Sequence, residues 1–197
     1  MFSMGTTSGI RPKNLSGEHY LNRDVEIRRL NGAEAWAFVG ALAAVLVDCV
    51  EGGASVSFMP PFGQADGEAF FSKVASGVEA GERILLAAFD DGKLVGTVQI
   101  VTALPPNQPH RADVAKLLVS RAARGKGVAQ RLMEAVDREA LAAGKTLLVL
   151  DTVTGSTAER LYERLGWVKV GVIPNYALFP DGRLTPTTIF WKELRRA

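Results

Sequence analysis

The sequence predicts an α/β (α+β) fold in which one sheet carries helices on its faces. The chain has 197 residues, of which 47% are hydrophobic, and this is enough for a single sizeable core. Segments with the two-residue alternation of strands are interspersed with segments of helical periodicity. Residues 117–143 combine a strand end, a glycine-containing turn and a long amphipathic helix, and we expect the other elements to be arranged around this stretch.

Composition narrows the class of protein. The net charge of +2 gives no sign of nucleic-acid binding. A single cysteine, Cys49, precludes an intramolecular disulfide and a Cys-based zinc site, and with only His19 and His110 we expect no metal. Residues 1–22 lack the apolar core of a signal peptide, so we expect a flexible N-terminal arm before one domain of residues 23–197. We expect a cytoplasmic protein with no membrane partner.

The domain begins with an alternating strand at residues 24–30, after which Asn31 can cap a helix over residues 33–49. The uninterrupted apolar run of this helix, residues 35–47, is shorter than the roughly 20 residues that cross a bilayer. The pattern therefore predicts a buried helix. Cys49 at its end is interpreted as a small core residue rather than a nucleophile.

The segment after this helix has two interpretations. Residues 52–61 run from small residues through Phe58 and Met59 into two prolines, so they form either a loop over the core or a wall of a substrate pocket. Residues 64–80 predict a second helix. One stripe of this helix is expected to hold three apolar side chains, Phe70, Val74 and Val78.

Two strands follow as a hairpin, residues 83–89 and 93–102, joined by the turn at residues 90–92. Gly96 inside the second strand suggests a bulge. Residues 110–120 form the fourth strand, which leads into the glycine-containing turn.

The long helix after that turn ends at Gly144. Its buried side chains are expected at a spacing of four: Val128, Leu132, Val136 and Ala140. An apolar fifth strand covers residues 146–151, and the pattern Ser156-x-x-Glu159 resembles a capping box for a short helix. Residues 167–172 and 187–194 are the sixth and seventh strands.

The turn itself, RGKGVA at residues 124–129, is suited to binding an anion. Glycine lets the backbone approach a ligand closely, and the first amides of the following helix carry partial positive charge. Arg124 and Lys126 add full charges, so the expected ligand is a phosphate or pyrophosphate. The turn is neither a Walker P-loop nor a Rossmann fingerprint, because Gln130 stands where the latter needs glycine.

The pattern R-x-x-G-x-A of Arg124, Gly127 and Ala129 resembles the acetyl-CoA pyrophosphate loop of GNAT N-acetyltransferases, and the order of the elements is similar to the GNAT fold. From Cys49 onward the chain resembles the tabtoxin-resistance acetyltransferases of that family. The similar stretches are residues 52–59, 110–119, 123–127, 150–162 and 180–194. The resemblance implies a mixed, mostly antiparallel sheet of about seven strands, flanked by about four helices and splayed between strands four and five.

Acetyl-CoA is the co-substrate that the resemblance implies. The residues it assigns to acetyl-CoA are Leu117, Leu118, Val119, Arg124, Gly125, Lys126, Gly127, Val128, Ala129, Gly155 and Ser156. Asp113 and Asp151 are its candidate general bases, and either could instead bind the ammonium of the acceptor or cap a turn. Tyr162 is the third catalytic candidate, as a hydrogen-bond donor to the leaving thiolate. The candidate acceptor-binding residues are Ser55, Phe58, Asn175, Tyr176 and Arg183.

The function implied is acetyl transfer to the amine of a small molecule by direct attack, with amino acids or β-lactam toxins as acceptors. Acetylation of a protein N-terminus or lysine is a second interpretation, and it predicts an open groove near residues 52–61 and 174–183. A non-catalytic acyl-CoA sensor is a third. A homodimer is compatible with the expected sheet edges near the C-terminus.

Overall fold

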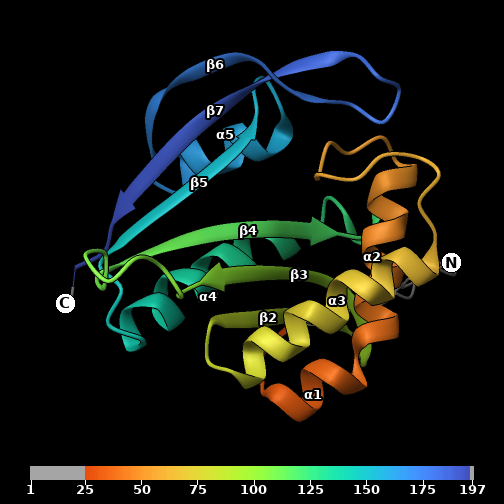
Figure 1. Cartoon of the computed structure of the whole chain (residues 1–197), viewed down its shortest axis with the longest axis horizontal. Coiled ribbons are helices and arrows are strands. Elements are labelled where there is room, and N and C mark those ends of the chain that lie inside the picture. Colours follow the sequence, from red (N-terminus) through yellow and green to blue (C-terminus); the bar gives the residue numbers. More distant parts are fainter. Residues whose placement is uncertain (1–24, 196–197) are drawn as a thin grey trace, which may run out of the picture.

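The computed structural model describes residues 25–195, and within them seven strands form one sheet (Figure 1). The strands are β1 Glu26–Leu30, β2 Arg83–Asp90, β3 Lys93–Val101, β4 Arg111–Val119, β5 Leu147–Val153, β6 Val168–Leu178 and β7 Leu184–Glu193. Their order is β1-β2-β3-β4-β5-β7-β6, and only the β4–β5 pair is parallel. The predicted mixed, mostly antiparallel sheet is confirmed. The predicted N-terminal arm and Asp24 lie outside the described residues.

The sheet opens between β4 and β5. These strands pair over only three positions, the last of which joins Asp113 to Val149. In Figure 1 their two arrows begin side by side and diverge toward the ends of the strands. Beyond Asp113, β4 is paired on one side only, with β3, so its other edge presents backbone groups toward the opening. The expected splay between the fourth and fifth strands is therefore present.

Helices cover both faces of the sheet. They are α1 Gly32–Ala37, α2 Val39–Glu51, α3 Gln64–Glu79, α4 Val128–Ala142 and α5 Thr157–Arg164, with a short 3-10 turn, η1, at Arg121–Ala123. Side chains of α4 and α5 share one buried cluster with the strands, and α1, α2 and α3 pack in a second. The four positions predicted to be buried on α4 are all 2% exposed or less.

The first predicted helix is wrong in one respect, because the chain forms two helices that meet at Phe38. Asn31 begins α1 with a capping box, its side chain accepting from the Glu34 amide at 2.9 Å, as the sequence suggests. Phe38 leaves helical geometry, at φ −97° and ψ 6°, and its ring packs edge-on against Phe89 of β2 at 5.2 Å between centroids. This break lets α1 and α2 each follow the surface of α3.

The predicted stripe of α3 packs against the second cluster, with Val74 buried and Phe70 and Val78 partly buried; Phe71 is also buried there. The predicted lengths of two strands need correction. Both C-terminal strands are longer than the sequence indicates, since β6 continues to Leu178 and β7 begins at Leu184. Their hairpin extends beside the opening in the sheet (Figure 1). The bulge suggested at Gly96 is present, because the β2–β3 register shifts beside it.

Glu159 ties the start of α5 to the sheet, although not as a full capping box. Ser156 accepts from the Glu159 amide at 3.1 Å, but the Glu159 carboxylate turns to the Gly155 amide instead of the Ser156 amide. The carboxylate also accepts from Thr188 at 2.9 Å and pairs with Lys169 at 3.1 Å. The residue is 7% exposed. The Gly155 amide, Lys169 and Thr188 outweigh the opposing effect of burial and hold the pKa of Glu159 below its usual range.

We expect Glu159→Gln to lower the free energy of unfolding by about 1–3 kcal/mol at pH 7, because the charged acceptor of these hydrogen bonds is lost. Since the pKa is depressed in the folded state, the contribution is complete above the ordinary glutamate pKa of about 4.3. It is lost as the pH falls through the lower folded-state pKa. Urea unfolding of the wild type and the variant at pH 7 and pH 3 measures the loss of unfolding free energy and its dependence on pH. Glu163→Gln, at an exposed position of the same helix, is the matched control, and an equal loss there would contradict the assignment.

Candidate active site

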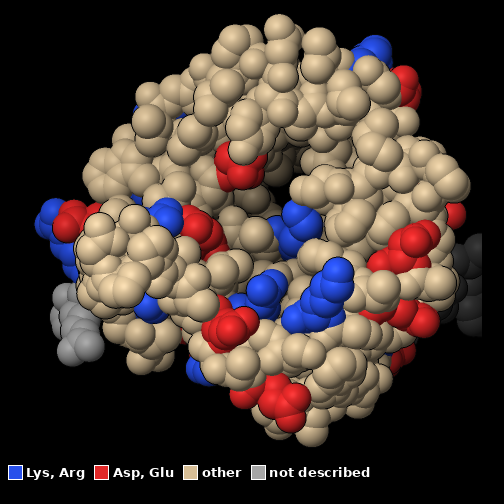
Figure 2. Space-filling model, in the orientation of Figure 1, with Lys and Arg blue, Asp and Glu red and all other residues tan. Residues whose placement is uncertain are grey.

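A cavity of about 580 Å³ lies where β4 and β5 diverge. It is lined by residues 53–59, by residues 114–117 of β4, by the end of β5, and by parts of α5, β6 and β7. Figure 2 shows the hollow in the middle of this face, with basic side chains below it and an acidic side chain at its edge. The pocket-wall interpretation of residues 52–61 therefore fits the structure for residues 53–59.

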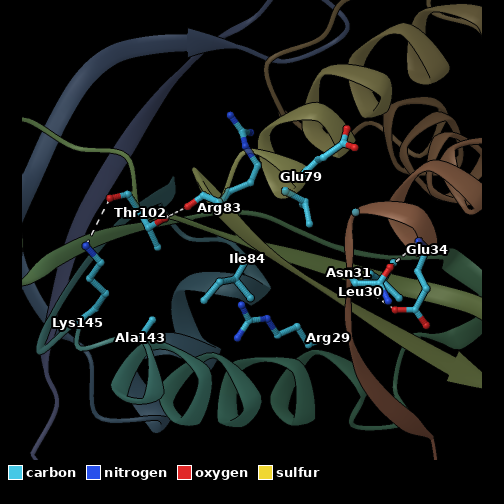
Figure 3. Close-up of a pocket in the computed structure, with 13 residues that line it drawn as sticks. Arg29, Leu30, Asn31, Glu34, Glu79, Arg83, Ile84, Thr102, Ala143 and Lys145 are labelled. Atoms are coloured by element: carbon cyan, nitrogen blue, oxygen red, sulfur yellow. Dashed lines mark hydrogen bonds between the residues drawn. The ribbon is translucent and has the colours of Figure 1, made fainter.

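A larger hollow, about 750 Å³, lies near the end of β1, the start of β2 and the end of β3 (Figure 3). None of the predicted site residues line it. Several of its charged side chains have partners within the fold. Lys145 donates to the carbonyl oxygens of Pro109 at 2.8 Å and Thr102 at 3.4 Å, and Arg29 pairs with Glu139 at 3.2 Å. Arg83 donates to Gln99 at 3.1 Å. The cavity between β4 and β5 is therefore the candidate active site.

Asp151 and Tyr162 both line that cavity. Asp151 comes near the end of β5, where its carboxylate accepts from the Thr187 hydroxyl at 2.9 Å. Tyr162 is 5% exposed and packs against Trp167 and Phe190. Burial, with the negative charge of Asp151 as a second cause, raises the pKa of Tyr162 well above its usual value. The phenol therefore stays protonated at neutral pH.

Asp113 lies outside the lining of this cavity. It occupies the last position at which β4 and β5 still pair, and Arg111 holds its carboxylate at 2.6 Å. Arg111 is held in turn by Gln108 at 2.8 Å. The two aspartates point to the same face of the sheet in strand alternation, but the structure brings only Asp151 to the cavity.

The glycine-containing turn has the geometry expected of an anion site. Gly127 precedes α4 with φ 76°, a conformation that favours glycine, and no side chain caps the helix. A Cβ at Gly125 or Gly127 would meet open space, so the turn faces outward. Arg124 donates to the carbonyl of Val119 at 3.2 Å, and Lys126 pairs with Asp90 at 3.2 Å.

The remaining residues expected at the co-substrate site fall into three places. Leu117 and Ser156 line the cavity, and Gly155 adjoins it. Leu118 and Val128 are buried, so they offer their backbone rather than their side chains. Val119 ends β4, Ala129 is the last residue of the glycine-containing turn, and both pack partly against the core.

Of the predicted acceptor-binding residues, three line the cavity and two lie outside it. Ser55, Phe58 and Tyr176 line the cavity. Arg183 pairs with Asp181 at 2.7 Å and lines a separate hollow, and Asn175 is exposed on β6 outside the cavity lining.

The structure adds one charged residue that sequence reasoning missed. Lys116 lines the cavity, and its ammonium donates to the Ser57 hydroxyl at 3.0 Å. Nothing in the sequence distinguishes it from a lysine on the solvent face of a strand. Its backbone does, since φ is 55° and the β3–β4 register shifts here.

Cys49 is buried, as predicted, at 2% exposed. It is nevertheless close to the site in space, because its thiol donates to the carbonyl of Val119 at 3.6 Å and Arg124 lies 3.9 Å from the sulfur. Burial raises the pKa of the Cys49 thiol, which disfavours the nucleophilic thiolate.

Residues 54–167 match the acetyltransferase (GNAT) family, and this match spans the cavity-lining loop, β4, the glycine-containing turn and α5. The chain belongs to the GNAT acetyltransferase family. It is accordingly an N-acetyltransferase, and acetyl-CoA is its co-substrate.

Solved structures agree on the fold. A putative acetyltransferase from Salmonella typhimurium, solved with acetyl-CoA, has a TM-score of 0.71 at 18% identity and covers 88% of this chain and 96% of its own. A ribosomal-protein-alanine N-acetyltransferase from Brucella melitensis has a TM-score of 0.71 at 22% identity, and the match covers 86% of this chain and 99% of that protein. A putative phosphinothricin N-acetyltransferase has a TM-score of 0.72 at 22% identity, and the match covers 88% of this chain and 100% of that protein. Identities this low establish the fold and leave the acceptor open.

The residues of this GNAT chain fit acetyl-CoA. The uncapped start of α4 offers backbone amides to a pyrophosphate, and Arg124 supplies positive charge beside them. Lys126 adds a second cation, which it shares with Asp90 at 3.2 Å. The first turn of α4 contains no acidic residue that would repel phosphate. Across residues 25–195 no group of His, Cys, Asp or Glu is placed to hold a metal ion, and no helix is long and apolar enough to span a bilayer.

Proposed function

We propose that this N-acetyltransferase acts on the amine of a small molecule, by direct attack of that amine on the acetyl group. The observation that carries the proposal is the shared cavity of Asp151 and Tyr162 at the point where β4 and β5 diverge. Amino acids and the toxins acetylated by tabtoxin-resistance enzymes are the acceptor class that the sequence resemblance favours. The likeness to a protein named for phosphinothricin, an amino acid, is consistent with that class.

Acetyl-CoA, when bound, supplies the acetyl group as a thioester. The glycine-containing turn at residues 124–129 would hold its pyrophosphate, and Ser156 and Gly155 would contact the pantetheine arm. The unpaired edge of β4 at residues 117–119 would offer a backbone amide to the thioester oxygen.

Asp151 would act as the base. An alkyl ammonium has a pKa of roughly 10, so at neutral pH only about one acceptor molecule in a thousand is reactive without deprotonation. Asp151 faces the cavity and would take the proton directly or through a water, whereas Asp113 is engaged by Arg111. Attack by the neutral amine would form the new C–N bond and break the C–S bond. The second proton of the attacking nitrogen would pass through solvent to the leaving thiolate, which would accept a hydrogen bond from Tyr162 and depart as the thiol. The raised pKa of Tyr162 favours a hydrogen bond to that sulfur over full proton transfer.

A protein acceptor is the second candidate function, and one contact counts against it. Ser55 donates to the carbonyl of Leu178 at 2.7 Å, so the loop at residues 53–59 is joined to the end of β6. This contact closes one side of the cavity where a peptide would need an open groove. Retention of Asp151 and Tyr162 in one cavity also argues against a non-catalytic sensor.

Titration with acetyl-CoA, followed by a thiol-release assay over a panel of small amines and N-terminal peptides, tests the proposal. We expect micromolar acetyl-CoA binding and turnover of one class of small amines. Preference for peptides over every small amine would replace this proposal with the protein-acceptor function. Binding without turnover of any acceptor would favour the sensor.

Tyr162→Phe is expected to lower kcat about 10- to 100-fold and to leave the KM for acetyl-CoA within about twofold, because only a hydrogen bond to the departing thiolate is removed. Steady-state thiol release measures both constants. The phenyl ring keeps the packing against Trp167 and Phe190, so the thermal midpoint should change little. An unchanged kcat would reduce Tyr162 to a core aromatic.

A further inference from the structure

Lys116 is brought into the cavity by an irregularity in β4. Regular alternation would place Val114, Lys116 and Leu118 on one face of the sheet. Val114 instead belongs to the core beneath α4, and Leu118 to the core beside α2 and α3. The change of face occurs at a bulge, where residues 116 and 117 lie opposite Val98 and Lys116 adopts φ 55°. Lysine rarely adopts such a conformation, and here it directs the side chain toward the loop at residues 53–59.

The ammonium of Lys116 has neutral partners. It donates to the Ser57 hydroxyl at 3.0 Å and lies 6.0 Å from the centre of the Phe58 ring. Within residues 25–195, Lys116 is the only cation that lines the cavity and Asp151 the only anion, and the two do not form a direct ion pair. Burial lowers the pKa of Lys116, with Asp151 acting in the opposite direction. An ammonium in such a site gains most from an anionic group that a ligand brings.

Two further cations within residues 25–195, Arg111 and Arg183, are engaged elsewhere. Arg111 is paired with Asp113 at 2.6 Å, and Arg183 with Asp181 at 2.7 Å. Arg183 also lines a different hollow. This leaves one positive and one negative side chain facing a single cavity of about 580 Å³.

We propose that Lys116 binds a carboxylate or similar oxyanion of the acceptor while Asp151 receives its amine. The acceptor is then a small molecule that carries both groups, as an amino acid does. This inference rests on the proposed function and deepens it, because it makes Lys116 the residue that selects an acidic acceptor.

Matched acceptors and matched variants test this role. Each standard L-amino acid is compared with its carboxamide, which keeps the amine and the side chain but removes the negative charge. The enzymes are the wild type, Lys116→Met, which keeps the apolar stem, and Lys116→Arg, which keeps the charge. Lys73→Met, at an exposed position of α3, removes the same charge far from the cavity. Thiol release gives kcat/KM, and acetyl-CoA titration reports on the co-substrate site separately.

For the amino acids that the wild type acetylates, we expect kcat/KM to exceed that for the matching carboxamide. Lys116→Met should lower kcat/KM for the acid about 10- to 100-fold, chiefly through KM, and leave that for the carboxamide nearly unchanged. Lys116→Arg should restore part of the loss, and Lys73→Met should have no effect. Acetyl-CoA affinity should be the same in all four proteins.

Three results would overturn the assignment. Equal losses for acid and carboxamide would give Lys116 a structural or general catalytic role. Weaker acetyl-CoA binding by Lys116→Met would show that the anionic group bound by Lys116 belongs to acetyl-CoA and not to the acceptor. An intact mass showing acetylated Lys116 after incubation with acetyl-CoA would make this lysine an acceptor itself. If the wild type does not bind acetyl-CoA or acetylates no small amine, the proposed function itself is contradicted. If the wild type acetylates small amines but does not prefer amino acids to their carboxamides, only the role of Lys116 is contradicted.

Discussion

Replacing Gly127 with glutamate is expected to abolish acetyl-CoA binding, with at least about a 100-fold rise in Kd, which corresponds to about 2.7 kcal/mol. Two effects combine. At φ 76° any other residue strains the backbone that sets the first turn of α4. The added carboxylate would also lie beside the amides and cations that should receive the pyrophosphate, and it would repel phosphate. Isothermal titration of acetyl-CoA into both proteins measures the change.

Gly144→Glu is the matched control for this experiment. Gly144 has φ 74° just beyond the other end of α4, and a Cβ there also meets open space. The control therefore introduces the same strain and the same charge without approaching the glycine-containing turn. It should unfold at a temperature similar to Gly127→Glu and bind acetyl-CoA as the wild type does. Equal loss of binding in both variants would mean that destabilisation, not the turn, explains the result.

Asp151→Asn should lower kcat/KM for the acceptor by about 10²–10⁴-fold at pH 7, because the group that deprotonates the ammonium is lost. Asparagine retains an oxygen that can accept from Thr187, so we expect little loss of stability. The KM for acetyl-CoA should not change. Raising the pH to 9 increases the neutral fraction of an amine of pKa 10 from about one in a thousand to about one in ten. The deficit of the variant should therefore shrink at high pH.

A deficit that is the same at pH 7 and pH 9 would show instead that Asp151 binds the acceptor without taking its proton. Asp113→Asn belongs in the same assay, because Asp113 is the other candidate base of the sequence resemblance. Its carboxylate is paired with Arg111 and is outside the cavity lining, so a loss of less than about tenfold is expected. A larger and pH-dependent loss in Asp113→Asn than in Asp151→Asn would transfer the role to Asp113.

The exposed apolar side chains of β6 bear on the predicted homodimer, which stays a prediction. β6 is one of the two edge strands of the sheet, and its Val168, Val170 and Val172 are between 44% and 65% exposed. An edge strand with this surface is suited to contact with another chain. Light scattering across a dilution series would decide the oligomeric state, independently of the acceptor.

Local features of the fold could be predicted from the sequence because neighbouring residues determine them. The stripe of Val128, Leu132, Val136 and Ala140 buries one face of α4 whatever that face meets. The glycines at residues 125 and 127 permit the turn by themselves, and Asn31 begins its helix through an amide three residues away. The order of strands and helices, together with the turn, carries the resemblance to the GNAT fold.

Tertiary structure alone decided which charged groups face the cavity. Asp113 and Asp151 look alike in sequence, but the point at which β4 and β5 part places only Asp151 in the lining. Arg111 and Arg183 form ion pairs with nearby carboxylates, and the β4 bulge directs Lys116 toward the cavity. Strand register and ion pairing depend on partners distant in the chain, and shifting a strand by one residue reverses the face of each side chain. The sequence by itself determined the fold and the glycine-containing turn, whereas the charges that face the cavity follow from how the strands meet.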